Sequence, residues 1–251
     1  MSATTKYKPN IEIVSDPESL AKRNVEIFVA HAQKAVDARG VFCVAISGGH
    51  TPRRFFELLG EIPQACSLPW DKTHLFWVDE RIVSADSALS NYKLAADTFL
   101  GKVAIPKQNV HRIPTEYEDF EAAARLYEGT IREVFGLEAG QIPEFDLMVL
   151  GVGADGHTGS LFPNSYALFD TEDLACVVYI LDDKPNRITL TRPVMCAASH
   201  LVVLACGREK AAILKNILTS EPDEVRYPIH ALWPALDKVT WLVDHEAAQA
   251  L

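Results

Sequence analysis

The chain has 251 residues, 48% of them hydrophobic, and its formal net charge at neutral pH is −10. That length and apolar content are enough for the core of one large α/β domain. The negative charge argues against a nucleic-acid partner, which would require a basic face to neutralise phosphates. A small anionic ligand stays compatible, because a few cations in a crevice outweigh diffuse charge elsewhere on the surface.

Neither membrane nor secreted proteins fit the pattern. No apolar run approaches the ~20 residues of a membrane-spanning helix, and residues 1–10 lack the apolar centre of a secretion signal. We therefore expect a cytoplasmic protein. The cysteines are odd in number and lack CxxC spacing, which predicts reduced, mostly buried thiols. They are Cys43, Cys66, Cys176, Cys196 and Cys206.

Apolar runs of strand length alternate with amphipathic stretches, and no linker divides them. This predicts an N-terminal extension over 1–10 and one α/β domain over 11–251. The domain opens with an expected strand at 11–14. Asp16 then supplies an N-cap and Pro17 a first-turn proline for a helix that Gly40 ends.

Residues 41–46 predict a buried strand that leads into the turn Ser47-Gly48-Gly49-His50-Thr51-Pro52. Thr51 can cap the next helix, and Pro52 can take its first position. Glycines leave the N–H groups of such a turn unshielded, and the helix N-terminus adds partial positive charge, so the segment can hold an anion. An ordinary tight turn explains the pattern equally well.

Residues 73–78 predict the next strand, which ends in Asp79-Glu80-Arg81. These charged groups either line a site at the edge of the sheet or form a solvated loop. Helices are expected at 91–100 and 117–135, with a strand at 110–113 between them.

Residues 146–150 predict a strand buried on both faces, as in parallel sheets covered by helices. The glycine-rich loop 151–160 then lies at the carboxyl end of that strand, where open α/β sheets bind ligands. It contains Asp155 and His157. An imidazole titrates near neutral pH and a carboxylate can fix its tautomer, so the two have the residue types of an acid/base pair.

In the last third, strands are expected at 174–180 and 187–191, which can pair antiparallel, and at 201–205 and 239–243. Lys210 should lie in the first turn of a helix at 211–218. A short helix is expected at 244–250.

Three other chemistries fit less well. Gly151, Gly153 and Gly156 match a dinucleotide fingerprint, but Pro163 arrives too soon for the helix that should follow. No serine has the flanking glycines of a hydrolase elbow. His157 and Asp155 provide at most two zinc ligands, and no further His/Cys pair has a metal-binding spacing, so we expect no metal.

Three separated motifs together resemble the 6-phosphogluconolactonase family, whose superfamily also contains the glucosamine-6-phosphate deaminases. They are SGGHTP at 47–52, DER at 79–81 and GVGADGHTGSLFP at 151–163. Segments 186–191 and 207–218 extend the resemblance, which runs in order from about Ile11 to the C-terminus.

The resemblance implies a three-layer α/β/α Rossmann-like fold with a mostly parallel sheet. It also implies a cofactor-free hydrolase that opens 6-phospho-D-glucono-1,5-lactone to 6-phosphogluconate in the oxidative pentose phosphate pathway. His157 would be the catalytic base, supported by Asp155. The substrate phosphate would be bound by Ser47, Gly48, Gly49 and Thr51, with cationic contacts from Arg81, Arg187 and Lys210. No obligate protein partner is implied.

Two alternatives remain. The deaminase branch resembles the chain in its glycine turn and Asp-Gly-His core, but its motif continues toward Asn-Glu-Pro, where this chain has Leu161-Phe162-Pro163. The apolar pair favours the lactonase. A non-catalytic sugar-phosphate-binding module is the other alternative, and the intact Asp155/His157 pair argues against it.

Overall fold

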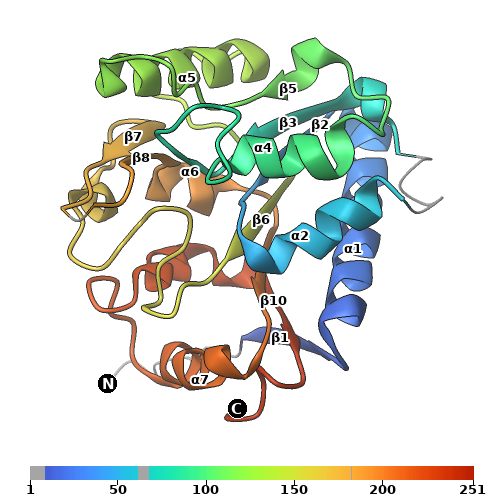
Figure 1. Ribbon diagram of the computed structural model, residues 1–251, viewed down its shortest axis with the longest axis vertical. Coiled ribbons are helices and arrows are strands. Elements are labelled where there is room, and N and C mark those ends of the chain that lie inside the picture. Colours follow the sequence, from blue (N-terminus) through green and yellow to red (C-terminus); the bar gives the residue numbers. More distant parts are fainter. Residues whose placement is uncertain (1–8, 62–67, 182) are drawn as a thin grey trace.

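The computed structural model describes residues 9–61, 68–181 and 183–251. A seven-stranded sheet lies at its centre, in the order β1-β10-β9-β6-β2-β3-β5, and all its neighbouring strands are parallel (Figure 1). Its strands are β1 (Asn10–Val14), β2 (Phe42–Ile46), β3 (Thr73–Trp77), β5 (Val110–His111), β6 (Leu147–Gly151), β9 (Leu201–Ala205) and β10 (Val239–Asp244). The predicted α/β fold with a mostly parallel sheet is confirmed.

A second sheet of three antiparallel strands has the order β4-β8-β7. It contains β4 (Asp79–Arg81), β7 (Ala175–Val178) and β8 (Arg187–Leu190). The expected strands at 174–180 and 187–191 do pair antiparallel. The charged triplet at 79–81 is therefore a strand joined to β8, and it is not a solvated loop.

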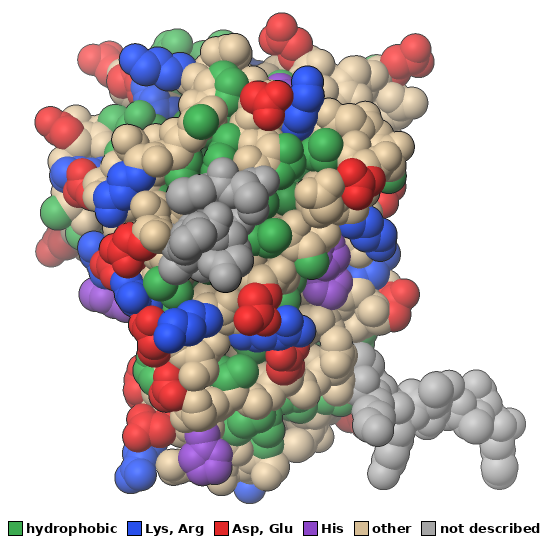
Figure 2. All heavy atoms as spheres, turned by 90° about the vertical axis from the view of Figure 1, so that its right-hand side faces the viewer, with side chains coloured by type: hydrophobic (Ala, Val, Ile, Leu, Met, Phe, Trp, Pro, Cys, Tyr) green, Lys and Arg blue, Asp and Glu red, His purple; other side chains and the backbone are tan. Residues whose placement is uncertain are grey.

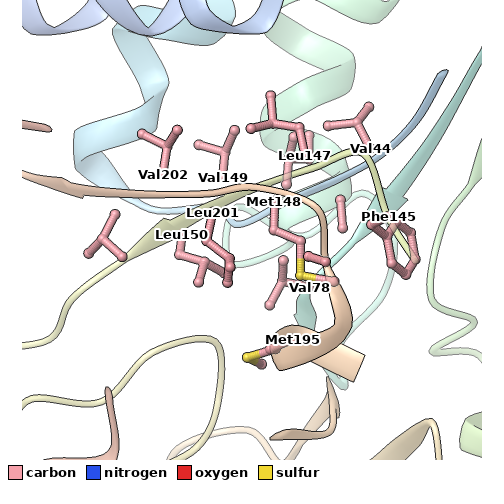
Figure 3. Packing of buried hydrophobic residues seen from close by; sticks show 14 of the residues in the cluster. Val44, Val78, Phe145, Leu147, Met148, Val149, Leu150, Met195, Leu201 and Val202 are labelled. Atoms are coloured by element: carbon pink, nitrogen blue, oxygen red, sulfur yellow. The ribbon is translucent and has the colours of Figure 1, made fainter. Parts of the chain in front are cut away.

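The inner strands of the large sheet are buried because side chains fill both of its faces. Leu147 and Val149 of β6 point to one face, and Met148 and Leu150 point to the other (Figure 3). All four side chains are at most 1% exposed. The continuous apolar run at 146–150 was thus correctly interpreted as a doubly covered strand.

Helices cover the two faces and complete three layers. The helices are α1 (Pro17–Arg39), α2 (His50–Leu59), α4 (Asn91–Ala95), α5 (Phe120–Phe135), α6 (Arg192–Ala197) and α7 (Ala211–Thr219). Phe28 of α1 packs edge-on against Phe42 of β2, with ring centroids 5.3 Å apart. Tyr127 of α5 packs against Phe76, which lies beside Ala45 in the register and so on the face opposite to Phe42.

The strand order reverses at β2 and β6. From β2 the chain continues to β3 and β5 on one side, and it returns to β6 and β9 on the other. The loops after β2 and β6 therefore leave the same edge of the sheet in diverging directions, which opens the crevice where such folds bind ligands. The glycine turn at 47–52 follows β2, and the Asp155/His157 loop follows β6.

Several element boundaries differ from those expected. Helix α1 has the predicted caps, with Asp16 accepting from Ser19 N and Gly40 in the left-handed region. Helix α5 starts at Phe120, and not at residue 117, because the Asp119 side chain caps it by accepting from Ala122 N at 2.9 Å. The helix expected at 91–100 is one α-turn followed by a π-helical turn, Ala96–Leu100.

The prediction of a C-terminal helix at 244–250 is wrong. Strand β10 runs on to Asp244, whose carboxylate accepts hydrogen bonds from Gly207 N and Ala247 N. This buried carboxylate stabilises turns over 245–250. The elements that the sequence did not predict include α6 and the 3₁₀ segment Pro228–Lys238.

The predicted extension at 1–10 falls mostly outside the described residues, and its boundary stays a prediction. Cys66 also lies outside them, while the other four cysteines are free thiols, with Cys43 and Cys176 buried. No helix of the described chain is long and apolar enough to cross a bilayer. On the face around α1, acidic and basic side chains are interspersed (Figure 2).

Candidate active site

Backbone hydrogen bonds within the loop after β6 fix its conformation. Gly153 N donates to His157 O at 2.8 Å, and Gly156 N donates to Gly153 O at 3.1 Å. Gly156 has a φ of +82°, which glycine adopts without strain, and it lies against Tyr227. Ile229 N donates to Gly156 O at 2.9 Å, so the 3₁₀ segment holds the loop from outside. The side chains on this loop are therefore presented by a defined backbone.

Asp155 and His157 meet as predicted. Asp155 Oδ1 lies 2.6 Å from His157 Nδ1 and also accepts from His157 N at 3.1 Å. Partial burial raises the pKa of the Asp155 carboxyl, but the hydrogen bonds and charge of His157 outweigh it and set the pKa at about 2. At neutral pH the carboxylate is an acceptor only, so Nδ1 is the donor in this contact, and the neutral tautomer that fits it has its lone pair on Nε2.

The imidazole is packed between a glycine and a phenylalanine. A Cβ added at Gly153 would overlap the His157 ring, so only glycine permits this position. On the other side, the Phe162 ring lies 4.6 Å from the imidazole, centroid to centroid. Phe162 also lies beneath the Arg187 guanidinium, 5.8 Å from its carbon. Phe162 therefore packs against both the His157 imidazole and the half-buried Arg187 guanidinium.

The turn after β2 differs from its prediction in one respect. Helix α2 begins at His50 with Gly49 as N-cap, so Thr51 lies inside the first turn and does not cap it. Gly49 has a φ of +113°, which lets the chain enter the helix earlier than Thr51 would allow. No side chain caps the N-terminus of α2, and the buried Ser47 hydroxyl has no hydrogen-bond partner among the described residues.

Arg81 and Arg187 are directly opposite each other across the β4–β8 pair. Directly opposite residues share a face of the sheet, where two like charges destabilise each other. Burial lowers the pKa of Arg187, and the positive charge of Arg81 lowers it further. Arg187 Nε is buried without a partner within the described chain. This pair of guanidinium groups is arranged to receive an anion.

The Asp79 carboxylate partly offsets the positive charge of Arg187. Its Oδ2 atom lies 3.8 Å from Arg187 Nη1 and accepts from the Ser160 hydroxyl at 2.7 Å. Asp79 is 5% exposed. Its carboxylate is therefore committed to a cation and a hydroxyl, which suits an orienting role for this residue.

Lys210 contacts the loop that follows β6. Its Nζ donates to Val152 O at 2.8 Å, just before Gly153. It comes from the 3₁₀ turn Arg208–Lys210 that precedes α7 and it serves as the N-cap position of that helix, not as part of its first turn. Lys210 thus places a cation beside the loop that carries His157.

The predicted site residues fall into two connected groups. Arg81 reaches the glycine turn through Asn91, whose carboxamide accepts from Arg81 Nη1 and fills the space beside Gly48. Arg187 and Lys210 flank the Asp155/His157 loop instead. Sequence reasoning missed Asn91 and Ser160, because no local pattern marks a contact made across 10 or 81 positions. The apolar pair that contains Phe162 was noticed, but its contact with His157 was not.

Among the described residues, no group of three or more His, Cys, Asp and Glu side chains is placed to hold a metal ion. What the site offers is a base with one free nitrogen, two opposed arginines and an uncapped helix N-terminus. Such a set suits hydrolysis of a phosphorylated substrate by an activated water.

Known proteins are similar to this chain over nearly its whole length. A family model described as glucosamine-6-phosphate isomerases/6-phosphogluconolactonase matches residues 15–241. A 6-phosphogluconolactonase of Synechocystis is 38% identical over 243 residues, covering 97% of this chain and 98% of its own. A chloroplastic 6-phosphogluconolactonase of Arabidopsis thaliana is 36% identical over 253 residues, covering 97% of this chain and 76% of its own.

Solved structures agree with the sequence matches. A 6-phosphogluconolactonase from Trypanosoma cruzi superimposes with a TM-score of 0.86 at 29% identity, covering 100% of this chain and 99% of its own. A monomeric glucosamine-6-phosphate deaminase superimposes with a TM-score of 0.81 at 19% identity, covering 96% of this chain and 100% of its own, which shows the shared fold alone. The chain belongs to the glucosamine-6-phosphate isomerase/6-phosphogluconolactonase family.

Proposed function

We propose that this chain hydrolyses 6-phospho-D-glucono-1,5-lactone to 6-phospho-D-gluconate, the lactonase step of the oxidative pentose phosphate pathway, with His157 as general base. The observation that carries the proposal is the Asp155–His157 contact of 2.6 Å, which leaves Nε2 free beside Phe162, the ring that also packs against the half-buried Arg187. The names of the full-length relatives support the same activity.

The reaction needs no covalent enzyme intermediate. Nε2 of His157 accepts a proton from water while the water oxygen bonds to the lactone carbonyl carbon. The resulting tetrahedral intermediate breaks its bond to the ring oxygen, and the imidazolium returns the proton to that oxygen as it leaves. Asp155 holds the imidazole in the required tautomer and stabilises its charged form.

The substrate phosphate binds at the glycine turn and the arginine pair. The unshielded N–H groups at the start of α2, the free Ser47 hydroxyl and the opposed guanidiniums of Arg81 and Arg187 provide donors for its oxygens. Thr51, Gly48 and Gly49 shape the turn, and Lys210 adds a cation beside the catalytic loop.

The neighbour of His157 distinguishes this site from a deaminase. The side chain beside the imidazole is the Phe162 ring, where the deaminase-like motif would provide a carboxylate. A phenyl ring cannot assist ring opening by proton transfer, so the site favours lactone hydrolysis. We place the enzyme in the cytoplasm, because a charged phosphate ester does not cross a bilayer unaided.

Proton release from freshly prepared lactone tests the proposal. Each charge-assisted contact to phosphate contributes roughly 1.5–3 kcal/mol, so unphosphorylated gluconolactone should show a kcat/KM at least about 10³-fold lower. Equal turnover of the two lactones would contradict the phosphate site. Binding of 6-phosphogluconate without turnover would indicate a sugar-phosphate-binding module, and ammonia release from glucosamine 6-phosphate would indicate a deaminase.

A further inference from the structure

The segment after β4 folds back onto the strand that it leaves, and a buried carboxylate holds it there. Glu80 is 3% exposed. Its two oxygens accept from Arg81 N at 2.7 Å, Asn91 N at 2.8 Å, Tyr92 N at 2.8 Å and the Ser90 hydroxyl at 3.0 Å. Glu80 therefore fixes the start of α4 against β4.

This anchoring sets the orientation of the Asn91 side chain, which is 2% exposed. Its Nδ2 donates to Asp79 O at 2.8 Å, so the amide end faces the strand backbone. Its Oδ1 must then face the other way, and there it accepts from Arg81 Nη1. Because each end of the carboxamide has a partner of the matching kind, the amide cannot flip without losing both bonds.

The same carboxamide lies against the glycine turn. A Cβ added at Gly48 would overlap Asn91 Oδ1 and the carbon that bears it. Gly48 is therefore glycine for lack of space, whereas Gly49 is glycine for its φ of +113°. Asn91 thus touches both parts of the proposed phosphate site, the turn after β2 and the guanidinium on β4.

Arg81 is held through one nitrogen only. Nη1 donates to Asn91 Oδ1 and to Leu89 O at 3.2 Å. Within the described chain, Nη2 and Nε of Arg81 have no hydrogen-bond partner, which leaves them for a ligand. Leu89 and Asn91 both belong to the segment that Glu80 anchors, so the direction of the guanidinium depends on that segment.

We propose that Asn91 is a positioning residue for the substrate phosphate, which holds the Arg81 guanidinium beside the glycine turn so that its free donors face the phosphate oxygens. This inference rests on the proposed function. It assigns Asn91 a role in binding through Arg81, and no role in the proton transfers at His157.

The test compares Asn91→Leu, which keeps the side-chain shape and removes both hydrogen bonds, with Asp97→Asn as the control. Asp97 lies in the π-helical turn that follows α4, and its exposed carboxylate accepts from Lys93 and, within the described chain, has no hydrogen bond or ion pair with Glu80, Arg81 or Gly48. For the phosphorylated lactone, Asn91→Leu should raise KM about 10-fold with kcat within about 2-fold, and KM for unphosphorylated lactone should not change. Asp97→Asn should leave both KM values unchanged.

Calorimetric titration with 6-phosphogluconate separates this inference from the proposed activity, because it needs no turnover. Asn91→Leu should weaken binding about 10-fold, and the double variant Asn91→Leu/Arg81→Ala should bind no worse than Arg81→Ala alone. If the wild-type chain binds 6-phosphogluconate but does not hydrolyse the lactone, the proposed function fails while this titration still decides the role of Asn91.

Asn91→Asp provides a second variant of the same size in case Asn91→Leu does not fold. Its carboxylate keeps the acceptor for Arg81 but competes with phosphate for the guanidinium, so 6-phosphogluconate should bind at least about 10-fold more weakly. Wild-type affinity in a folded Asn91 variant would overturn the inference. An equal loss in Asp97→Asn, or a loss that simply adds to that of Arg81→Ala, would also overturn it.

Discussion

At the scale of single residues, the proposed mechanism depends on which nitrogen of His157 is free. The Asp155 carboxylate takes Nδ1–H, and its pKa of about 2 keeps it ionised throughout the working pH range. A loss of activity on mild acidification should therefore not come from protonation of Asp155. The profile of kcat/KM against pH should show no step that belongs to this carboxyl in that range.

Replacing the base tests this assignment. His157→Asn keeps a similar size but cannot accept the proton, and we expect kcat to fall about 10²–10⁴-fold with affinity for 6-phosphogluconate retained. Asp155→Asn should cost less, and the double variant should be little worse than His157→Asn, because the two residues act as a unit. A folded His157→Asn enzyme with near-normal kcat would exclude this base.

Gly153 offers a subtler test at the same place, because the catalytic side chains stay intact. A Cβ at Gly153 would overlap the His157 ring and approach Asp155 Oδ1 within 2.6 Å. Gly153→Ala should therefore displace the imidazole and lower kcat about 10²-fold or more. Gly151→Ala is the control, since a Cβ there meets nothing within 4 Å. Similar kcat values for the two variants would mean that the position of the ring is not critical.

At the scale of elements, the second sheet brings Arg187 to a site built mainly by loops of the first. The antiparallel pairing of β4 and β8 places Arg187 opposite Arg81, and the chain between β6 and α7 places Lys210 against the catalytic loop. In the proposed function, these cations come from different elements but bind one phosphate. Contacts of that kind are made in the ground state and the transition state alike, so their loss should show in KM more than in kcat.

Alanine variants test whether these residues act in substrate binding or in the chemical step. Arg187→Ala or Lys210→Ala should raise KM about 10- to 100-fold and lower kcat by a smaller factor, as expected when a charge-assisted contact to phosphate is lost. Lys215→Ala, an exposed lysine on α7, is the control and should leave KM unchanged. A fall in kcat at constant KM in both Arg187 and Lys210 variants would instead assign these residues to the transition state.

How far the elements could be predicted depends on how local their signals are. The caps of α1 and the buried strand β6 follow from residues adjacent in sequence, and both were predicted. The role of Glu80 depends on N–H groups 11 and 12 positions away, and the Ser160–Asp79 bond spans 81 positions. No periodicity carries such information. The charged triplet at 79–81 could therefore be interpreted either as a loop or as part of a site.

At the scale of the whole molecule, the order of strands makes the separate motifs into one site. The glycine turn and the His157 loop are about 100 positions apart in sequence, yet β2 and β6 are neighbours in the sheet. The alternation of apolar runs predicted a parallel sheet but not this order. The resemblance to a known family implied a layered Rossmann-like fold but gave no strand order, which the structure supplies.

Stability across the molecule should depend on pH through histidines outside the site that are partly or fully buried. Burial lowers the pKa of five of them, His31, His74, His111, His200 and His230. Four form two contacts: His74 Nδ1 lies 3.0 Å from His111 Nε2, and the rings of His31 and His200 stack 4.5 Å apart. Burial, and then the neighbouring imidazole, lower the pKa of His111 and of His200 to about 4.

The direction of this pH dependence follows from the difference in proton binding between the folded and the unfolded chain. A histidine of the unfolded chain binds a proton below about pH 6.5, whereas these groups stay neutral in the fold until the pH approaches 4. The stabilisation is therefore complete above about pH 6.5 and is lost as the pH falls toward 4.

Denaturant unfolding, followed by the fluorescence of the buried Trp77 and Trp241, should give a lower free energy of unfolding at pH 5 than at pH 7. His111→Gln should reduce that difference, and His245→Gln, at an exposed position, should not. An unchanged difference in His111→Gln would show that the His74–His111 contact does not contribute to the acid sensitivity of the fold.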